Sequence, residues 1–111
     1  MSQSAPSQTL PIRATTAIEK RRFVTAAGAQ AGAAANTLGV SMYGVANDED
    51  VPVHNLGTAE VEAGGPIAVD GAIETDANGK AVAHAAGPVV ARALEAANAD
   101  GDVIEVVLIP N

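Results

Sequence analysis

Cysteine is absent from this sequence of 111 residues, and aromatic residues are scarce. Without cysteine the chain has no disulfide framework, no thiolate nucleophile and no thiolate metal ligand. Phe23 and Tyr43 are its two aromatic residues, so a core must be built from Ala, Val, Ile and Leu. Because aromatic side chains bury the most surface per residue, such a domain gains stability by burying faces against copies of itself or a partner.

Positive charge is also scarce, and it is unevenly placed. The net charge is −7; residues 1–40 carry four cations and one acid, whereas residues 41–111 carry two cations and twelve acids. An acidic body repels a phosphate backbone, which argues against binding of nucleic acid. The one basic run comprises Lys20, Arg21 and Arg22, and it is interpreted as a solvated strand edge or a contact with another protein.

Long apolar runs are missing as well. The sequence has no uninterrupted apolar stretch of about eighteen residues, and its first twenty residues lack the apolar segment of a secretory signal. It therefore predicts no membrane span, no membrane partner and synthesis in a cytoplasm.

The residues that are present divide the chain into two parts. Residues 1–11 (MSQSAPSQTLP) are polar and contain too little apolar surface to offset the entropy of ordering, so they are predicted to form a flexible arm. Residues 12–111 contain short apolar runs separated by Gly, Asn, Asp and Pro at intervals of about 8 to 12 residues. This pattern predicts a single, mostly β domain, a compact antiparallel β-sandwich or small barrel.

The predicted strands follow the apolar runs between the turn residues. Asn78 and Gly79 can adopt the two positive φ values of a type I′ hairpin. Residues 87–98 (GPVVARALEAAN) fit either a strand or a helix, the one short helix that the chain could hold. The predicted strands are residues 12–18, 21–25, 38–45, 50–55, 58–63, 72–75, 81–84, 89–96 and 103–109.

A weak internal repeat relates the two halves of the sequence at an offset of 52 residues. In both places an acidic turn precedes an apolar strand, and residues 38–45 then correspond to residues 90–97, which favours a strand in the ambiguous segment. The matching residues are Asn47, Asp50, Val51 and Leu56 with Ala99, Asp102, Val103 and Leu108.

Three acidic loops contain oxygen ligands at spacings that could hold a metal ion. Asn98, Asp100 and Asp102 have the spacing of the first three ligands of an EF-hand, but Val103 and Ile109 occupy the positions of the required glycine and glutamate. The shorter pairs, Asp76 with Asn78 and Asp48 with Asp50, are typical of turns that bind their own backbone. No metal site or other cofactor is predicted.

Catalytic groups are not arranged in any recognisable pattern. His54 and His84 have no partner at a ligand spacing, and Ser41 lies in an apolar strand without the frame of a nucleophile. Residues 26–35 lack the lysine of a phosphate-binding loop. Glu60 and Glu62 share a strand face but have few bulky residues to form a pocket, so a solvated face is their expected role. The protein is predicted not to be an enzyme.

Four segments together resemble the capsid decoration, or capsid cement, proteins of tailed bacteriophages. The resemblance covers nearly the whole chain after residue 11 and consists of aliphatic strands and turns. Its segments are TTAIEKRRFVTAAGAQA (15–31), NTLGVSMYGV (36–45), VPVHNLGTAEVEAGGPIAVDGAIETDANGKAV (51–82) and ARALEAANADGDVIEVVLIP (91–110).

This resemblance implies a structural subunit of the virion that binds the major capsid protein on the outside of the expanded head. Such proteins often bind as trimers and brace neighbouring capsid subunits. A polar arm can add as a strand to the edge of a capsid sheet, while basic residues approach an acidic shell. The predicted capsid-binding residues are Thr9, Leu10, Pro11, Ile12, Arg13, Lys20, Arg21 and Arg22.

A surface-displayed β module that binds carbohydrate or another ligand is the alternative interpretation. Such modules usually stack sugars on exposed Trp or Tyr rings, and Tyr43 alone is poorly suited to that role.

Overall fold

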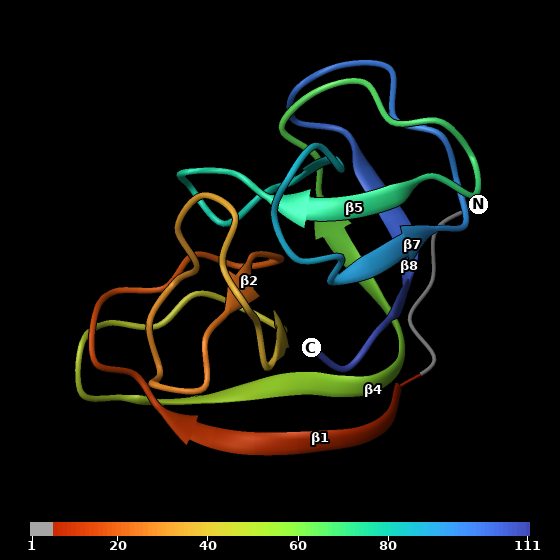
Figure 1. Ribbon diagram of the computed structural model, residues 1–111. Helices are drawn as coiled ribbons and strands as arrows, with labels where there is room; N and C mark the ends of the chain where they lie inside the picture. Colours follow the sequence, from red (N-terminus) through yellow and green to blue (C-terminus); the bar gives the residue numbers. More distant parts are fainter. Residues whose placement is uncertain (1–5) are drawn as a thin grey trace.

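The computed structural model describes the backbone of residues 6–111 and the side chains of residues 11–111. These residues form an eight-stranded antiparallel sheet that curls into a nearly closed barrel and contains no helix, hence no helix able to span a membrane (Figure 1). The predicted mostly β fold is confirmed, in its small-barrel form. The strands are β1 (Pro6–Arg13), β2 (Phe23–Val24), β3 (Gly39–Ser41), β4 (Asp50–Glu62), β5 (Ala72–Thr75), β6 (Ala81–Ala83), β7 (Ala91–Ala93) and β8 (Val103–Leu108).

The strand order is β2-β3-β4-β8-β7-β5-β6, and β1 pairs with β4 outside this path. The two ends of the order approach each other. The Phe23 N–H at the start of β2 donates to the carbonyl oxygen of Gly79, next to β6, at 2.8 Å, and Ala63 forms a parallel bridge with Ala81. These contacts nearly close the sheet.

β1 crosses the predicted boundary between arm and domain. Residues 6–13 lie along the first half of β4 as an antiparallel strand of the same chain (Figure 1). The boundary at residues 11 and 12 is therefore not an edge of the fold. Main-chain hydrogen bonds order this segment, and they require none of the apolar side chains that its composition lacks. The rest of the predicted arm, residues 1–5, lies outside the described residues.

One other prediction about strands needs correction, and one alternative that was left open is resolved. Residues 50–55 and 58–63 are a single strand, β4, in which Gly57 takes a φ of 89° and continues the ladder. The ambiguous segment 87–98 contains β7 and no helix. Ala91 and Ala93 are buried while Arg92 between them is exposed, so the burial period is the two residues of a strand.

The predicted hairpin between β5 and β6 is present, but its turn is not type I′. Gly79 has a φ of 73°, whereas Asn78 does not have a positive φ. The Asp76 side chain accepts hydrogen bonds from the Asn78 N–H at 2.8 Å and the Lys80 N–H at 2.9 Å. These bonds favour a longer loop in which only the glycine is left-handed.

The barrel consists of two units with the same backbone path, residues 9–56 and residues 58–108. Each begins with a strand, continues through an isolated bridge (Ile18 to Val45, Ile67 to Ala97) and ends with a strand pairing back to the first. Left-handed residues recur at matching positions, with φ of 56° at Arg21 and 67° at Asp70. β4 serves both as the last strand of the first unit and as the first strand of the second.

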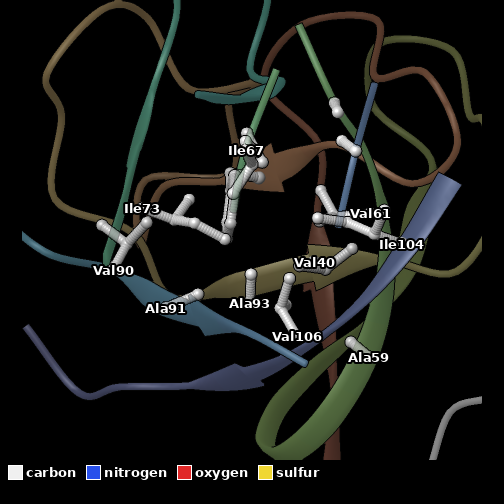
Figure 2. Packing of buried hydrophobic residues seen from close by; sticks show 14 of the residues in the cluster. Val40, Ala59, Val61, Ile67, Ile73, Val90, Ala91, Ala93, Ile104 and Val106 are labelled. Carbon is white, nitrogen blue, oxygen red and sulfur yellow. The ribbon is translucent and has the colours of Figure 1, made fainter. Parts of the chain in front are cut away.

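The buried residues repeat in the same way. A small cluster in the first unit consists of Ala14, Ile18, Val24, Val51 and Val53. The residues at the matching positions of the second unit are Ala63, Ile67, Ile73, Ile104 and Val106, and all five belong to the main cluster. In Figure 2 the labelled members of that cluster gather inside the barrel; most lie on β4, β5, β7 and β8, and Val40 lies on β3.

The predicted repeat is thus present, with one change of register. The correspondence of β3 with β7 has the predicted offset of 52 residues, but β4 and β8 match at 53, so that Val51 matches Ile104. Adjacent residues of a strand face opposite sides. The offset of 52 pairs the fully buried Val51 with the half-buried Val103, whereas 53 pairs two buried residues.

Candidate docking surface

The outer edge of β1 is open at Thr9 and Pro11, whereas at Arg13 the backbone of Gly28 packs against the carbonyl oxygen. The Ala14 N–H donates to the Glu49 carbonyl oxygen at 2.8 Å, so the preceding N–H, that of Arg13, points away from β4. The carbonyl oxygen of Pro52 accepts a hydrogen bond from Met42, on the β3 side. Pro11, which pairs with Pro52 in the register, therefore also directs its backbone outward. By the same alternation Thr9 faces outward.

In the second unit the corresponding strand edge, that of Glu62, is covered. There the Glu62 N–H, which matches that of Arg13, donates to the carbonyl oxygen of Arg21 at 3.0 Å. The covering residue comes from the first unit. Within the described residues β1 has no ladder partner other than β4. One of two equivalent edges is therefore hydrogen-bonded inside the chain at Glu62. The other packs against Gly28 at Arg13 and is open at Thr9 and Pro11.

The predicted site residues in β1 have different surroundings. The Arg13 guanidinium lies 3.3 Å from a carboxylate oxygen of Asp48 and 3.3 Å from one of Asp50, and all three side chains are exposed. Exposed pairs of this kind contribute little to stability. Ile12 is half-buried against the small cluster, and Pro11 is exposed. Thr9 and Leu10 are placed by their backbone alone.

The predicted basic run divides into two surface residues and one buried residue. Lys20 is exposed and Arg21 half-buried in the turn before β2, and among the described residues neither side chain lies within 4.0 Å of a carboxylate. The side chain of Arg22 is only 8% exposed. Lys20 and Arg21 are therefore available to a partner, and Arg22 is not.

Arg22 is held inside a network of charges that joins the two units. Its guanidinium lies 3.1 Å from Glu19 and 3.4 Å from Glu62, and it donates to the Asn78 carbonyl oxygen at 3.0 Å. The sequence predicts that Arg22 lies at the surface as a capsid contact, but its side chain is buried. Sequence reasoning missed its role because Glu62 and Asn78 are 40 and 56 residues away.

Lys80 extends this network to Asp100. The ammonium group lies 3.2 Å from Glu62 and 2.8 Å from Asp100. The hydrogen bond and charge of Lys80 lower the pKa of Asp100, and the hydrogen bonds that Lys80 donates to Asp100 and Glu62 raise the pKa of Lys80. Both groups are thereby held in their charged forms, which keeps the two loops that carry them together.

A hollow of about 210 Å³ lies beside Arg21. Its walls come from the turn before β2, the end of β3 and both halves of β4, and burial lowers the pKa of His54 in its wall. The hydroxyl of Ser41 donates to the Glu19 carbonyl oxygen at 2.7 Å and so holds the turn against β3. The lining residues are Arg21, Ser41, Met42, His54 and Glu60.

The acidic loops bind their own backbone. Asp102 accepts hydrogen bonds from the N–H groups of Asn98 at 2.8 Å and Ala99 at 3.3 Å, as a turn-forming aspartate does. His84 contacts the Gly87 carbonyl oxygen at 2.9 Å. Across residues 6–111, no group of three or more His, Asp or Glu side chains is placed to hold a metal ion.

In the part of the chain that the structure describes, the small antiparallel barrel leaves part of a strand edge open and two cations without a carboxylate within 4.0 Å, which are features of a protein that binds other proteins. Its family is shown by the sequence: residues 1–108 match the family of phage cement proteins, and the chain belongs to that family. It is thus a structural component of the phage capsid. No match is found among curated proteins.

A solved structure with a similar fold is the N-terminal base of the head fibre gp8.5 of bacteriophage phi29. The two chains superpose with a TM-score of 0.76 and 21% sequence identity, over 92% of this chain and 93% of the other. At this identity the likeness establishes the barrel fold.

Proposed function

We propose that this protein binds the outer surface of the expanded phage head as a trimer, contacts the major capsid protein through β1 and the turn at Lys20 and Arg21, and stabilises the shell. The observation that supports this most directly is the open edge of β1 in a member of the cement family. The equivalent edge in the second unit is covered, so the opening is not a general property of the barrel.

An open edge of this kind can accept an extended segment of a partner. Thr9 and Arg13 direct their N–H groups outward, and Pro11 between them has none. Main-chain hydrogen bonds give such an added strand its affinity. Because Pro11 cannot donate, the partner strand must leave one carbonyl unpaired there or turn away. Proline thus limits pairing to a short segment and disfavours indiscriminate aggregation.

Charge orients the docking. The chain carries a net charge of −7, yet Lys20 and Arg21 are surface cations without a carboxylate partner in the described region. An acidic shell surface repels most of the protein and attracts this turn, which favours a single orientation. In a trimer three such contacts act together, so that each can be weak by itself.

The test is co-sedimentation of the purified protein with expanded heads that lack it. The wild-type protein should pellet with the heads and should have three times the 11.0 kDa chain mass in solution. Thr9→Pro removes an outward donor without removing a β1–β4 hydrogen bond, so it should stay folded and lose binding. Thr9→Ala keeps that donor and serves as the matched control.

A wild-type protein that remains in the supernatant would contradict head binding. A protein that is monomeric in solution and still pellets would contradict a trimer formed before docking, and it would leave head binding intact. If Thr9→Pro, folded by circular dichroism, binds as tightly as Thr9→Ala, the edge of β1 is not the contact.

A further inference from the structure

The second unit exposes an aliphatic patch at the turn before β5. Val69 in this turn is 61% exposed, the largest exposed fraction among the large apolar side chains of residues 11–111, and Leu94 directly after β7 is 45% exposed. Residues 68–70 lie along residues 94–96, since backbone hydrogen bonds of 3.0 Å and 2.8 Å join the two segments at either end. The exposed residues of the aliphatic patch are Ala68, Val69, Leu94 and Ala96.

The matching turn of the first unit is covered inside the chain. There the Arg21 carbonyl oxygen accepts a hydrogen bond from the Glu62 N–H of β4 at 3.0 Å, and Arg21 is half-buried. Asp70 has the matching position and a similar left-handed φ, 67° against 56°. It is exposed, however, and no backbone N–H of residues 11–111 donates to its carbonyl oxygen. Of two equivalent turns, the aliphatic one is therefore left uncovered by the described part of the chain.

The charges around the aliphatic patch suit contact between copies of this chain. A protein with a net charge of −7 repels its own copies wherever acids dominate its surface. At the patch, Arg92 lies 3.3 Å from Asp70, and both side chains are exposed. Glu95, the acid beside the patch, is half-buried and accepts a hydrogen bond from the Glu105 N–H at 2.8 Å. The exposed charges of the patch are thus one cation and one acid, which two copies can exchange as partners.

The aliphatic patch also lies away from the proposed capsid contact. In Figure 1 the chain between β4 and β5, which carries Val69, lies on the opposite side of the barrel from β1. Copies joined at the patch therefore leave their β1 edges available to the shell.

We infer that three copies of this chain meet through the aliphatic patch, with Val69 and Leu94 packed around the threefold axis. Arg92 of each copy then lies beside Asp70 of the next copy. Around a cyclic axis this contact occurs three times, so every copy has a partner for both charges. Burial of the aliphatic side chains favours the association, and it stabilises a domain that has few aromatic residues of its own. This inference assigns the interface of the proposed trimer and rests on that proposal.

The experiment measures the mass of the full chain by sedimentation equilibrium over a range of concentrations. Leu94→Ser and Met42→Ser change equivalent residues that are 45% and 44% exposed. Val69→Lys introduces the residue that the first unit has at the matching position. Leu94→Ser and Val69→Lys should each weaken one contact about tenfold, so that the association constant of the trimer falls about a thousandfold. Met42→Ser is the matched control and should leave the trimer unchanged.

A charge reversal tests the pairing between copies. Arg92→Glu places two acids together at each contact and should dissociate the trimer, whereas Arg92→Glu combined with Asp70→Arg should restore it. The first unit already has an arginine, Arg21, at the position of Asp70, so the left-handed turn accepts that residue. Exposed ion pairs contribute little to stability, and circular dichroism spectra like that of the wild type establish that each variant is folded.

Three results would overturn the inference while the trimer itself stands: Leu94→Ser and Val69→Lys variants that stay trimeric, a Met42→Ser variant that dissociates as readily as Leu94→Ser, or an Arg92→Glu variant that Asp70→Arg does not restore. A wild-type protein that is monomeric at every concentration would overturn both the trimer in solution and this inference. Co-sedimentation with heads tests the proposed head binding independently of either result.

Discussion

The two units of the barrel share a backbone path but differ in the side chains at equivalent positions. The second unit has Ile73 and Ile104 where the first has Val24 and Val51. The first unit instead carries polar or bulky groups: Arg22 where the second has Gly71, and His54 where it has Val107. The pattern of buried positions is thus sufficient for the fold. Residues beyond that pattern, which differ between the units, indicate where the protein has acquired a function.

Replacement of Phe23 is expected to change the free energy of unfolding more than the other substitutions. The matching residue of the second unit is Ala72. Phe23 is the one aromatic residue in the core and is fully buried. Phe23→Ala makes the first unit resemble the second and should lower the free energy of unfolding by about 3–5 kcal/mol. Urea denaturation measures this loss. A cost below about 1 kcal/mol would mean that the core does not depend on its only aromatic ring.

The matched pair Ile104 and Val51 compares the two buried clusters directly. Ile104→Ala should cost about 3 kcal/mol and Val51→Ala about 2 kcal/mol, because isoleucine buries one more methylene. Urea denaturation of both variants, analysed with a common m-value, measures the two losses. Equal losses would indicate that the smaller cluster is packed more tightly than the larger, since Val51→Ala removes fewer atoms.

Variants of Arg22 and Arg13 compare a buried ion-paired arginine with an exposed one, both in the first unit. Arg22→Ala leaves Glu62 half-buried with Lys80 alone and should destabilise by about 2 kcal/mol. Arg13→Ala removes only exposed pairs and should cost less than about 1 kcal/mol. Thermal unfolding of both variants checks the order, and the reverse order would contradict the assigned role of Arg22.

His54 should make stability depend weakly on pH, in a way that the second unit does not. Burial lowers its folded pKa below the ordinary value of 6.5. As the pH falls through 6.5, the unfolded chain takes up a proton before the folded chain does, so stability decreases. His54→Val introduces the residue of the second unit and should remove this part of the decrease. Urea midpoints at pH 7 and pH 5 give the comparison.

Much of the fold could be predicted from the sequence because short aliphatic runs and turn residues carry local signals. The repeat also identified β7 as a strand, by matching it to β3. Its register was one residue off because acidic turns, which vary in length, determined the alignment. The pattern of buried residues gives the correct register, because a shift of one residue along a strand exchanges its buried and exposed faces.

The parts that could not be predicted depend on contacts between distant residues. β1 has a polar composition, so only its pairing with β4 shows that it belongs to the sheet. Arg22 is indistinguishable from Lys20 and Arg21 in sequence, yet its partner Glu62 buries it. Of the candidate site, the sequence located the basic turn and the β1 residues, but it gave no indication of the hollow that adjoins Met42.

β4 extends without a break from one unit into the other, over 13 residues. A pull along β1 is therefore transmitted through a single extended backbone to the ladder with β8, with no loop between them to stretch. In that direction the hydrogen bonds of the β1–β4 ladder, which lie across the strands, are loaded together and not one after another. If the first strand fastens the protein to the expanded shell, as we propose, the barrel would resist stretching along that strand.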